Sequence, residues 1–281
     1  MDNSVNSDLM IKYNNLLDFF KDKTVVVAFS GGVDSSLVAE IAHRSSKRMV
    51  ALTTNSITVL PGEIEDAIKF AKNQGWEHRV VDINELEDAN FSENPVNRCY
   101  FCKTGLSTEL KKVAEEIHAD LIVEGTNFTE ITEHRPGLVA LKENQISSPL
   151  LKEQLSKDDI RSLAQYLGLS TANKPSLACL SSRFPYGVKI TPEKLRRVGL
   201  AERYIIDTYH INTLRVRDHD GLARIEVAPN EREKLLSTKI LDDLNNKLRT
   251  FGFNYVSIDC RGYKTGSLNE TVANLEILIE H

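Results

Sequence analysis

Buried strands and amphipathic helices alternate in the pattern of apolar and polar positions along the first half of the chain. Residues 24–29, TVVVAF, form a continuous apolar and β-branched run, which is typical of a strand buried on both faces of a parallel sheet. Apolar residues then recur at helical spacing over residues 35–42, which predicts a helix. Gly31 and Gly32 therefore lie at the turn between a strand and a helix.

The same alternation continues through the first domain. Strands are predicted at residues 49–54, 78–83 and 121–126, and helices at residues 63–74, 105–118 and 156–169. Alternating strands and helices favour a doubly wound, mostly parallel α/β sheet that binds its ligands at the carboxyl ends of the strands. The helix from Ser156 has an S-x-x-D start and a glycine stop, so we expect it to close a first domain of residues 1–172.

The remaining residues, 173–281, predict a smaller α+β domain. It is preceded by an irregular stretch, residues 171–190, whose two prolines and four hydroxyl residues are typical of a loop between domains or a functional loop. Thr191 and Pro192 then start a helix. A hairpin of strands 213–218 and 222–228, a charged helix from about residue 230 and a strand at 254–259 complete the prediction.

Composition narrows the class of protein. The 281 residues are 41% apolar and 27% charged, which is enough to bury a core. No run approaches the roughly 20 apolar residues of a membrane helix, and the first residues are polar and acidic, so we expect a cytoplasmic protein with no membrane partner. A net charge of -5, without aromatic residues interleaved among basic runs, argues against nucleic acid as a partner.

Phosphate is the ligand that the chemistry of residues 30–36, SGGVDSS, predicts. Glycines let the backbone approach an anion, free N–H groups and the helix dipole favour negative charge, and the serine hydroxyls add donors. The segment matches neither the Walker pattern G-x-x-x-x-G-K-[ST] nor the dinucleotide pattern G-x-G-x-x-G. A tight turn in which Asp34 acts only as a helix cap is the alternative interpretation.

SGGVDSS after VVVAF resembles the pyrophosphate loop of the PP-loop ATPases, enzymes of the adenine nucleotide alpha-hydrolase-like fold. They split ATP into AMP and pyrophosphate while adenylating a substrate, so the resemblance implies ATP and Mg2+. EGTN, after the fourth predicted strand, is similar to a second segment that flanks the nucleotide, although a plain turn is an equal alternative without that context. The ATP-binding residues implied by the resemblance are Ser30, Gly31, Gly32, Asp34, Ser35, Gly125, Thr126 and Asn127.

Four cysteines are too few for a disulfide framework in a chain of this length. In a reducing compartment, cysteines are more typical of catalysis or metal binding. Cys99 and Cys102 form a C-x-x-C, and Cys179 lies in a stretch of small and serine residues. Cys260 closes a predicted strand and is expected to be a small core residue.

Three segments together resemble the LarE family: residues 97–103, NRCYFCK; residues 178–187, ACLSSRFPYG; and residues 262–270, GYKTGSLNE. Residues 134–141, HRPGLVAL, are also similar to a LarE segment. LarE proteins make the nickel-pincer cofactor of lactate racemase by ATP-dependent sulfur insertion. The resemblance implies that a carboxylate of a nicotinate-derived mononucleotide is adenylated and then becomes a thiocarboxylate. The sulfur nucleophile would be Cys179, which becomes dehydroalanine in sacrificial members.

The two extra thiols depart from the single-cysteine pattern. Cys99, Cys102 and Cys179 are a set that could hold three irons of a [4Fe–4S] cluster, as in a cluster-bearing branch of LarE and in the iron–sulfur tRNA thiolases. The fourth iron could then carry a sulfide to the adenylate. A zinc site, for which no fourth ligand is evident, and an ordinary structural C-x-x-C at a helix start are the alternatives.

Arginines supply candidate anion ligands. Arg215 and Arg217 alternate along a predicted strand, so both face one side of it, and paired guanidinium groups suit the phosphate of a mononucleotide. Arg183 is a further candidate for the phosphate or carboxylate of the substrate. The alternative for the strand pair is an exposed face with ordinary charges.

Other functions remain open at this point. Another PP-loop enzyme, either a tRNA thiolase or an amide-forming ligase, would share the loop, but an amide ligase has no need of Cys179. A non-catalytic nucleotide-binding or iron–sulfur module would release no pyrophosphate. Analogy with the family suggests a homo-oligomer, and the sulfur donor upstream stays unknown.

Overall fold

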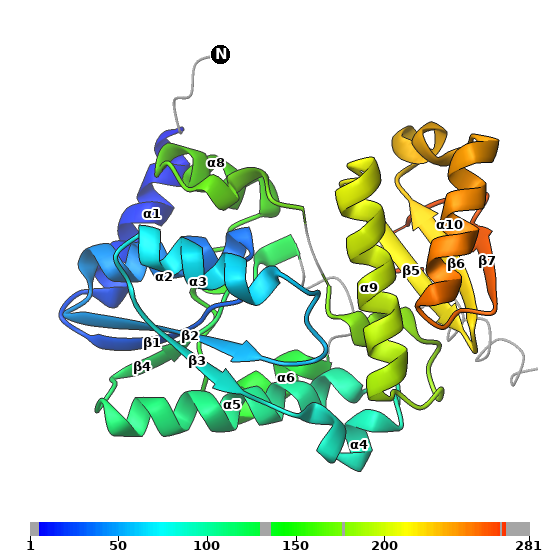
Figure 1. Ribbon diagram of the computed structural model, residues 1–281. Helices are drawn as coiled ribbons and strands as arrows, with labels where there is room; N and C mark the ends of the chain where they lie inside the picture. Colours follow the sequence, from blue (N-terminus) through cyan, green and yellow to red (C-terminus); the bar gives the residue numbers. More distant parts are fainter. Residues whose placement is uncertain (1–5, 130–135, 176–177, 265, 268–281) are drawn as a thin grey trace, which may run out of the picture. The chain divides into compact units, whose positions relative to one another are not determined.

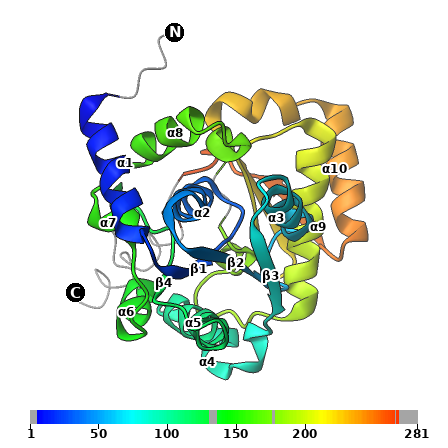
Figure 2. The ribbon, with the colours of Figure 1, turned by 90° about the vertical axis from the view of Figure 1, so that its left-hand side faces the viewer.

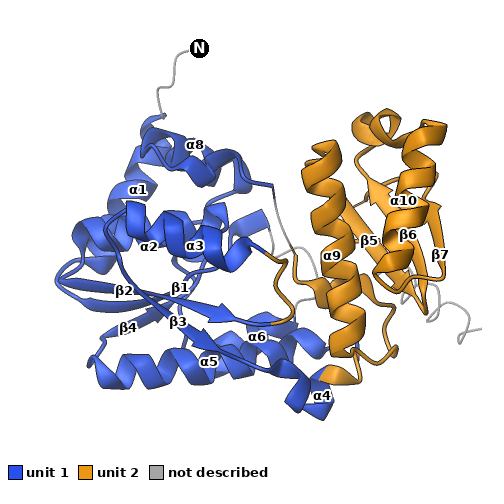
Figure 3. Cartoon of the chain, viewed as in Figure 1, with its two compact units in different colours: residues 1–56, 62–91, 96–176 blue, residues 57–61, 92–95, 177–281 orange. Residues whose placement is uncertain are grey.

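The computed structural model describes residues 6–129, 136–175, 178–264 and 266–267. They form two compact units (Figure 1 and Figure 3). Unit 1 comprises residues 1–56, 62–91 and 96–176, and unit 2 comprises residues 57–61, 92–95 and 177–281. None of the helices in this described part of the chain is long and apolar enough to span a membrane.

Unit 1 is built on a parallel four-stranded sheet in the order β3-β2-β1-β4. β1 is central: Val26 pairs with Val50 of β2 on one side and with Ile122 of β4 on the other. The valines of β1 are fully buried, as expected for a strand covered on both faces. The strands are β1 (Thr24–Ala28), β2 (Arg48–Asn55), β3 (Glu77–Asp82) and β4 (Leu121–Val123).

Helices cover both faces of this sheet (Figure 2). Val25 and Val27 belong to a core shared with α1, α2, α3 and α8, whereas Val26 belongs to a second core shared with α5 and α6. This division follows from the period of two along a strand. The helices are α1 (Ser7–Phe20), α2 (Val33–Ser45), α3 (Glu63–Asn73), α5 (Arg98–Glu116), α6 (Pro136–Glu143) and α8 (Lys157–Tyr166). The shorter elements are η1 (Glu85–Glu87), α4 (Ala89–Ser92), α7 (Pro149–Lys152) and η3 (Ser170–Asn173).

Unit 2 contains a three-stranded sheet in the order β5-β6-β7. β5 and β6 form the hairpin that the sequence predicts, and β7 runs parallel to β6. α9 packs against β5 and α10 against β7 (Figure 1). The elements are η4 (Leu180–Arg183), α9 (Pro192–Tyr209), β5 (Leu214–His219), β6 (Leu222–Val227), η5 (Pro229–Leu235), α10 (Thr238–Thr250) and β7 (Tyr255–Ile258).

The predicted starts of α8 and α9 agree with the structure, and a side chain caps each of these two helices. Ser156 and Asp159 form the predicted capping box of α8, in which each side chain bonds the backbone N–H of the other residue. Thr191 caps α9 by accepting a hydrogen bond from the N–H of Lys194. By contrast, the charged helix predicted from about residue 230 consists of η5 and then α10, because α10 begins only after its own cap, Ser237.

The helix predicted at residues 105–118 begins at Arg98, so Cys99 and Cys102 lie in the first turns of α5 and not in a loop before it. The hydroxyl groups of Thr104 and Ser107 donate to carbonyl oxygens of the preceding turn, which lets these polar residues continue the helix. Gly105, the first residue of the predicted helix, therefore lies in the interior of α5.

α1 lies outside the predicted elements, although its pattern was available. Its buried residues Leu9, Tyr13, Leu16 and Phe20 recur at helical spacing, and Asn6 caps it by accepting a hydrogen bond from the N–H of Leu9. α1 packs onto the core that α2, α3 and α8 share, and no sequence motif points to this helix.

The irregular stretch around residues 178–190 is ordered by the two short segments that unit 2 takes from the first half of the chain (Figure 3). The N–H of Leu180 donates to the carbonyl oxygen of Thr58 at 2.7 Å. The buried Asn94 donates to the carbonyl oxygens of Pro185 and Val188, at 2.7 and 3.2 Å. Hydrogen bonds from distant segments thus take the place of regular secondary structure in this loop.

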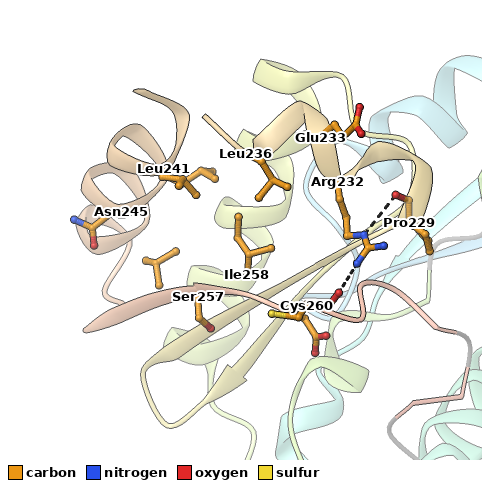
Figure 4. Close-up of a pocket in the computed structure, with 12 residues that line it drawn as sticks. Pro229, Arg232, Glu233, Leu236, Leu241, Asn245, Ser257, Ile258 and Cys260 are labelled. Carbon is orange, nitrogen blue, oxygen red and sulfur yellow. Dashed lines mark hydrogen bonds between the residues drawn. The ribbon is translucent and has the colours of Figure 1, made fainter. Parts of the chain in front are cut away.

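A groove of about 620 Å3 lies on unit 2 between η5, α10 and β7 (Figure 4). Arg232 at this groove donates to the carbonyl oxygens of Pro229 and Cys260. Cys260 lines the groove and is exposed, so its expected place in the core is wrong. β7 ends at Ile258, and the chain then turns at Asp259, whose carboxylate accepts hydrogen bonds from the next N–H groups, before Cys260 can enter the sheet.

Candidate functional site

The strand order places two loops of unit 1 next to each other, at the carboxyl ends of the adjacent strands β1 and β4. β2 and β3 follow β1 to one side of the sheet, whereas β4 lies on its other side. The connections that leave β1 and β4 therefore diverge, and an open parallel sheet binds ligands at such a switch point, beyond the carboxyl ends of its strands. Residues 30–36 follow β1, and residues 124–127 follow β4.

The glycines of the first loop set its shape. Gly31 has a φ of +72°, in the left-handed region, and a Cβ there would lie 3.2 Å from the Cβ of Ala67, so both conformation and space favour glycine. Gly32 is the N-cap of α2 and offers no side-chain cap, which leaves the N–H groups of the first turn directed at the loop. These groups and the helix dipole favour a negatively charged ligand such as phosphate.

The serines of the loop form a hydrogen-bonded set. The hydroxyl oxygens of Ser30 and Ser35 lie 3.1 Å apart, and the Ser35 hydroxyl also donates to the carbonyl oxygen of Gly32 at 3.1 Å. The N–H of Ser30 donates to the Ser35 hydroxyl at 3.2 Å. These hydrogen bonds connect the two ends of the loop to each other.

The second loop packs directly on the start of α2. A Cβ on Gly125 would lie 2.8 Å from the backbone nitrogen of Ser35, a distance that only glycine permits. The side-chain amide of the buried Asn127 donates to the carboxylate of Asp34 at 3.3 Å. The structure thus brings these two segments together, as the resemblance to PP-loop enzymes implied.

A buried carboxylate holds the second loop in shape. Glu124 accepts hydrogen bonds from the N–H and the hydroxyl of Thr126, at 3.0 and 2.6 Å, and another from the hydroxyl of Ser148. The Thr126 hydroxyl therefore contributes to the turn. Glu124 was not among the predicted site residues, although it begins the EGTN segment.

The carboxylate of Asp34 fits a Mg2+–phosphate complex. It lies in the first turn of α2, is partly exposed, and offers the hard oxygen ligand that Mg2+ prefers. Bound Mg2+ would neutralise charge on the phosphates of a nucleotide. Mg2+ usually takes only one or two protein carboxylates, so one such residue beside the loop is sufficient.

In unit 2, Arg183 is buried against Glu202. Its guanidinium donates to both carboxylate oxygens of Glu202 at 2.8 Å, and also to the carbonyl oxygens of Ala178 and Cys179. Burial by itself would lower the pKa of Arg183, but the paired carboxylate more than offsets this and raises the pKa above its ordinary value. Arg183 is therefore a fixed cation that holds the backbone around Cys179.

Arg215 and Arg217 lie on β5 next to this pair, and both are buried, which contradicts the alternative of an exposed strand face. Arg217 bonds Glu226 at 2.9 Å and donates to the carbonyl oxygen of Ser182 at 2.6 Å. Arg215 lies over the ring of Tyr263, 5.1 Å from its centre. Burial, and then repulsion by Arg183, lowers the pKa of Arg215. An anion at this cluster would relieve that repulsion.

Cys179 itself is exposed and precedes η4 as its N-cap. Its carbonyl oxygen accepts hydrogen bonds from Arg183 and from the N–H and hydroxyl of Ser182, the latter two at 3.1 and 2.9 Å. An accessible thiol is thus carried on a backbone that three donors hold in place. A rigid backbone under an accessible sulfur suits a nucleophile.

Cys99 and Cys102 lie one turn apart on α5, so both thiols are on one side of that helix in unit 1. Gly137 of α6 packs over this turn, and a Cβ there would lie 3.4 Å from the carbonyl oxygen of Cys99. Among the described residues, no three His, Cys, Asp or Glu side chains stand close enough together to hold a metal ion. Cys99 and Cys102 belong to unit 1, and Cys179 belongs to unit 2.

Some predicted segments extend beyond the described residues. In the segment 262–270, Thr265 and residues 268–270 lie outside them, and so do His134 and Arg135 of the segment 134–141. The described Ser267 is bonded by Arg217 at 3.0 Å, which connects the end of the described chain to the arginine cluster.

A parallel sheet in this order, with a glycine- and serine-rich loop between its central strand and the next helix, defines the chain as a PP-loop ATPase. The family model of NAD synthase matches residues 8–132. An uncharacterised protein of Synechocystis sp. is 41% identical over 263 residues, which cover 93% of this chain and 98% of the relative. The pyridinium-3,5-bisthiocarboxylic acid mononucleotide synthase of Lactiplantibacillus plantarum is 32% identical over 272 residues, 96% and 98% of the two chains. The chain belongs to the LarE family and is an ATP-dependent sulfurtransferase.

More distant similarity extends to other PP-loop enzymes. A tRNA-specific 2-thiouridylase of Sphingopyxis alaskensis is 28% identical over 192 residues, which cover 55% of this chain and 50% of that relative. The similarity to the synthase, in contrast, spans both units.

The sequence interpretation missed the carboxylates that hold the arginines. Glu202 lies on α9 and Glu226 on β6, and both are almost fully buried. Glu226 stands opposite Arg215 in the hairpin, a cross-strand register that the two strand predictions could have suggested. Glu202 had no such signal, because its partner is distant in sequence.

Proposed function

We propose that this chain uses ATP to convert a carboxylate of a nicotinate-derived mononucleotide into a thiocarboxylate, in the synthesis of a nickel-pincer cofactor. The observation that carries the proposal is the 32% identity to the synthase over 96% of the chain. The two loops at the switch point of unit 1 would bind ATP, and the arginine cluster of unit 2 would bind the anionic substrate.

The first step is adenylation. A carboxylate oxygen of the substrate attacks the α-phosphorus of ATP, the bond to the bridging oxygen breaks, and pyrophosphate leaves. The backbone of Gly31 and Gly32 and the hydroxyls of Ser30 and Ser35 would bind that pyrophosphate. The segment of Gly125, Thr126 and Asn127 would flank the nucleotide.

The second step replaces AMP with sulfur. A carboxylate is a poor electrophile, whereas the adenylate carries a good leaving group, so a thiolate can attack its carbonyl carbon and release AMP. If the thiolate belongs to Cys179, a thioester forms. Removal of the Cα proton then breaks the Cβ–S bond, leaves dehydroalanine in the chain and releases the thiocarboxylate.

The arginine cluster would bind the substrate. A mononucleotide carries a phosphate, and Arg215 is a buried cation whose charge is opposed by its arginine neighbours. Arg217 forms an ion pair with Glu226, and Arg183 forms one with Glu202. These two arginines would therefore position Arg215 and add positive charge around it, and they could also contact the substrate directly.

Cys99, Cys102 and Cys179 would be the three thiolate ligands of a [4Fe–4S] cluster. Such a cluster would supply sulfide and spare the thiol of Cys179. Support for this comes from the spacing of the cysteines and from the accessibility of Cys99 and Cys179.

The test is direct. Oxygen-free protein is incubated with ATP, Mg2+ and the carboxylated pyridinium mononucleotide, and AMP, pyrophosphate and thiocarboxylate are measured by chromatography and mass spectrometry. We expect the three products in equal amounts per carboxylate converted. Pyrophosphate release with ammonia incorporated would indicate an amide ligase. Activity only with tRNA would indicate a thiolase, the function of the more distant relative.

A further inference from the structure

Two lysine side chains of unit 1 lie against the pyrophosphate loop, although they come from elements outside it. The ammonium nitrogen of Lys174, just after η3, lies 3.1 Å from the carbonyl oxygen of Gly31 and 2.6 Å from the carboxylate of Glu63. The ammonium nitrogen of Lys157, the first residue of α8, lies 2.5 Å from the carboxylate of Asp34. Each ammonium group is thus next to the loop and is held there by a carboxylate.

The backbone around both lysines is fixed by other contacts. Arg161 donates to the carbonyl oxygens of Ala172 and Lys174, at 2.6 and 3.2 Å. The N–H of Lys157 donates to the hydroxyl of Thr129 at 3.1 Å. The two ammonium groups therefore do not depend on their ion pairs alone for a place beside the loop.

The ion pairs themselves can be exchanged. The side chains of Lys157 and Asp34 are 28% and 21% exposed, and those of Lys174 and Glu63 are 21% and 12% exposed. Water reaches such pairs and weakens them. Phosphate oxygens carry more charge than one carboxylate, accept shorter and stronger bonds from an ammonium group, and would also bond the free N–H groups of α2.

We propose that Lys157 and Lys174 bind the β- and γ-phosphates of ATP and then the leaving pyrophosphate, and that Asp34 and Glu63 hold them in place until ATP arrives. The triphosphate takes over both lysines and displaces the carboxylates. The two positive charges then stabilise the negative charge that develops on the bridging oxygen as the bond to the α-phosphorus breaks. This inference rests on the proposed function only in requiring ATP to be cleaved at that bond.

The experiment measures binding without the acceptor substrate. The affinities of the full chain for inorganic pyrophosphate, ATP and AMP are determined by titration calorimetry for Lys157→Ala, Lys174→Ala and wild type. We expect each alanine variant to bind pyrophosphate and ATP about tenfold more weakly, the loss of one charge-assisted bond, and to bind AMP as wild type does. The exposed Lys69→Ala on α3 is the matched control and should bind all three ligands normally.

The effect of Glu63→Gln on pyrophosphate affinity distinguishes a phosphate-binding role of Lys174 from a purely structural one. Glu63→Gln releases Lys174, so in a chelating buffer without metal it should bind pyrophosphate as tightly as wild type or more tightly. A structural ion pair predicts the opposite, weaker binding with a lower melting temperature. Wild-type affinity for pyrophosphate in both lysine variants, or equal losses for AMP, would overturn the inference. Failure of the wild type to form thiocarboxylate while the binding pattern holds would overturn only the proposed function.

Discussion

The guanidinium group of Arg183 and the carboxylate of Glu202 form two hydrogen bonds of 2.8 Å each, and both side chains are 1% exposed. The same carboxylate accepts the N–H of Val216, so it connects α9, η4 and β5. The arginine cluster and the backbone of Cys179 are therefore held by one buried ion pair.

Replacement of Glu202 by Ala should lower the free energy of unfolding by about 3–5 kcal/mol, because it leaves the Arg183 charge buried without its counter-ion. Urea denaturation measures the change. The control is Asp207→Ala on the same helix, which removes an exposed pair with Arg203 and should change stability by less than about 1 kcal/mol. Similar losses in the two variants would contradict the prediction.

Replacement of Gly31 by Ala should weaken ATP binding by about tenfold or more, because a Cβ there is forced into a left-handed conformation and against Ala67. Gly75 has the same φ of +72° but no atom within 4 Å of the added Cβ, so Gly75→Ala tests conformation alone. That control should be less stable by about 1–2 kcal/mol and should bind ATP normally. Calorimetric titration with ATP measures both variants, and equal affinities would refute the steric argument.

Replacement of Arg215 by Ala should raise the KM for the mononucleotide by about tenfold or more, while the KM for ATP stays unchanged. The reason is that this side chain is proposed to bind the phosphate of the mononucleotide and not ATP. Steady-state assays of pyrophosphate release measure both constants. The exposed Arg249→Ala on α10 is the control. Unchanged kinetics in Arg215→Ala would remove this residue from the substrate site.

Protein purified without oxygen should contain about four irons and about four or more acid-labile sulfides per chain. Both should be lost in Cys99→Ala and kept in Cys260→Ala. The reason is that a cluster needs direct thiolate ligands, and Cys260 is outside the proposed set. If wild type carries no iron, Cys179 returns to the sacrificial role. The chain should then become lighter by one hydrogen sulfide after turnover, as measured by intact mass.

Stability should fall as the pH drops through about 6.5, the value of an unfolded histidine. Burial lowers the pKa of His78 in the folded chain, so the unfolded state takes up the proton first and is favoured as the pH falls. The contribution of His78 is fully present above that pH. Urea denaturation at about pH 5.5 and about pH 8 should show a smaller difference for His78→Gln than for wild type. The same difference in wild type and in His78→Gln would contradict the assignment.

The sequence by itself determined the alternating sheet and the loop chemistry of unit 1. Apolar periodicity is local, so β1 and α2 could be predicted from it, and SGGVDSS needs only its strand and helix as context. Cap residues such as Ser156 and Thr191 marked helix starts, because a cap acts within one turn. The predicted start of α5 was wrong because the hydroxyl groups of Thr104 and Ser107 bond carbonyl oxygens of the preceding turn, so the helix already begins at Arg98.

Only the tertiary structure decided which carboxylates meet the arginines and the lysines. Glu202 reaches Arg183, and Lys174 reaches the loop at Gly31, across separations in sequence that no periodic pattern encodes. The same holds for the residues around Thr58 and Asn94, which order the loop after Cys179. Such pairings depend on chain folding that brings distant segments together and on the need to satisfy every buried charge and backbone group.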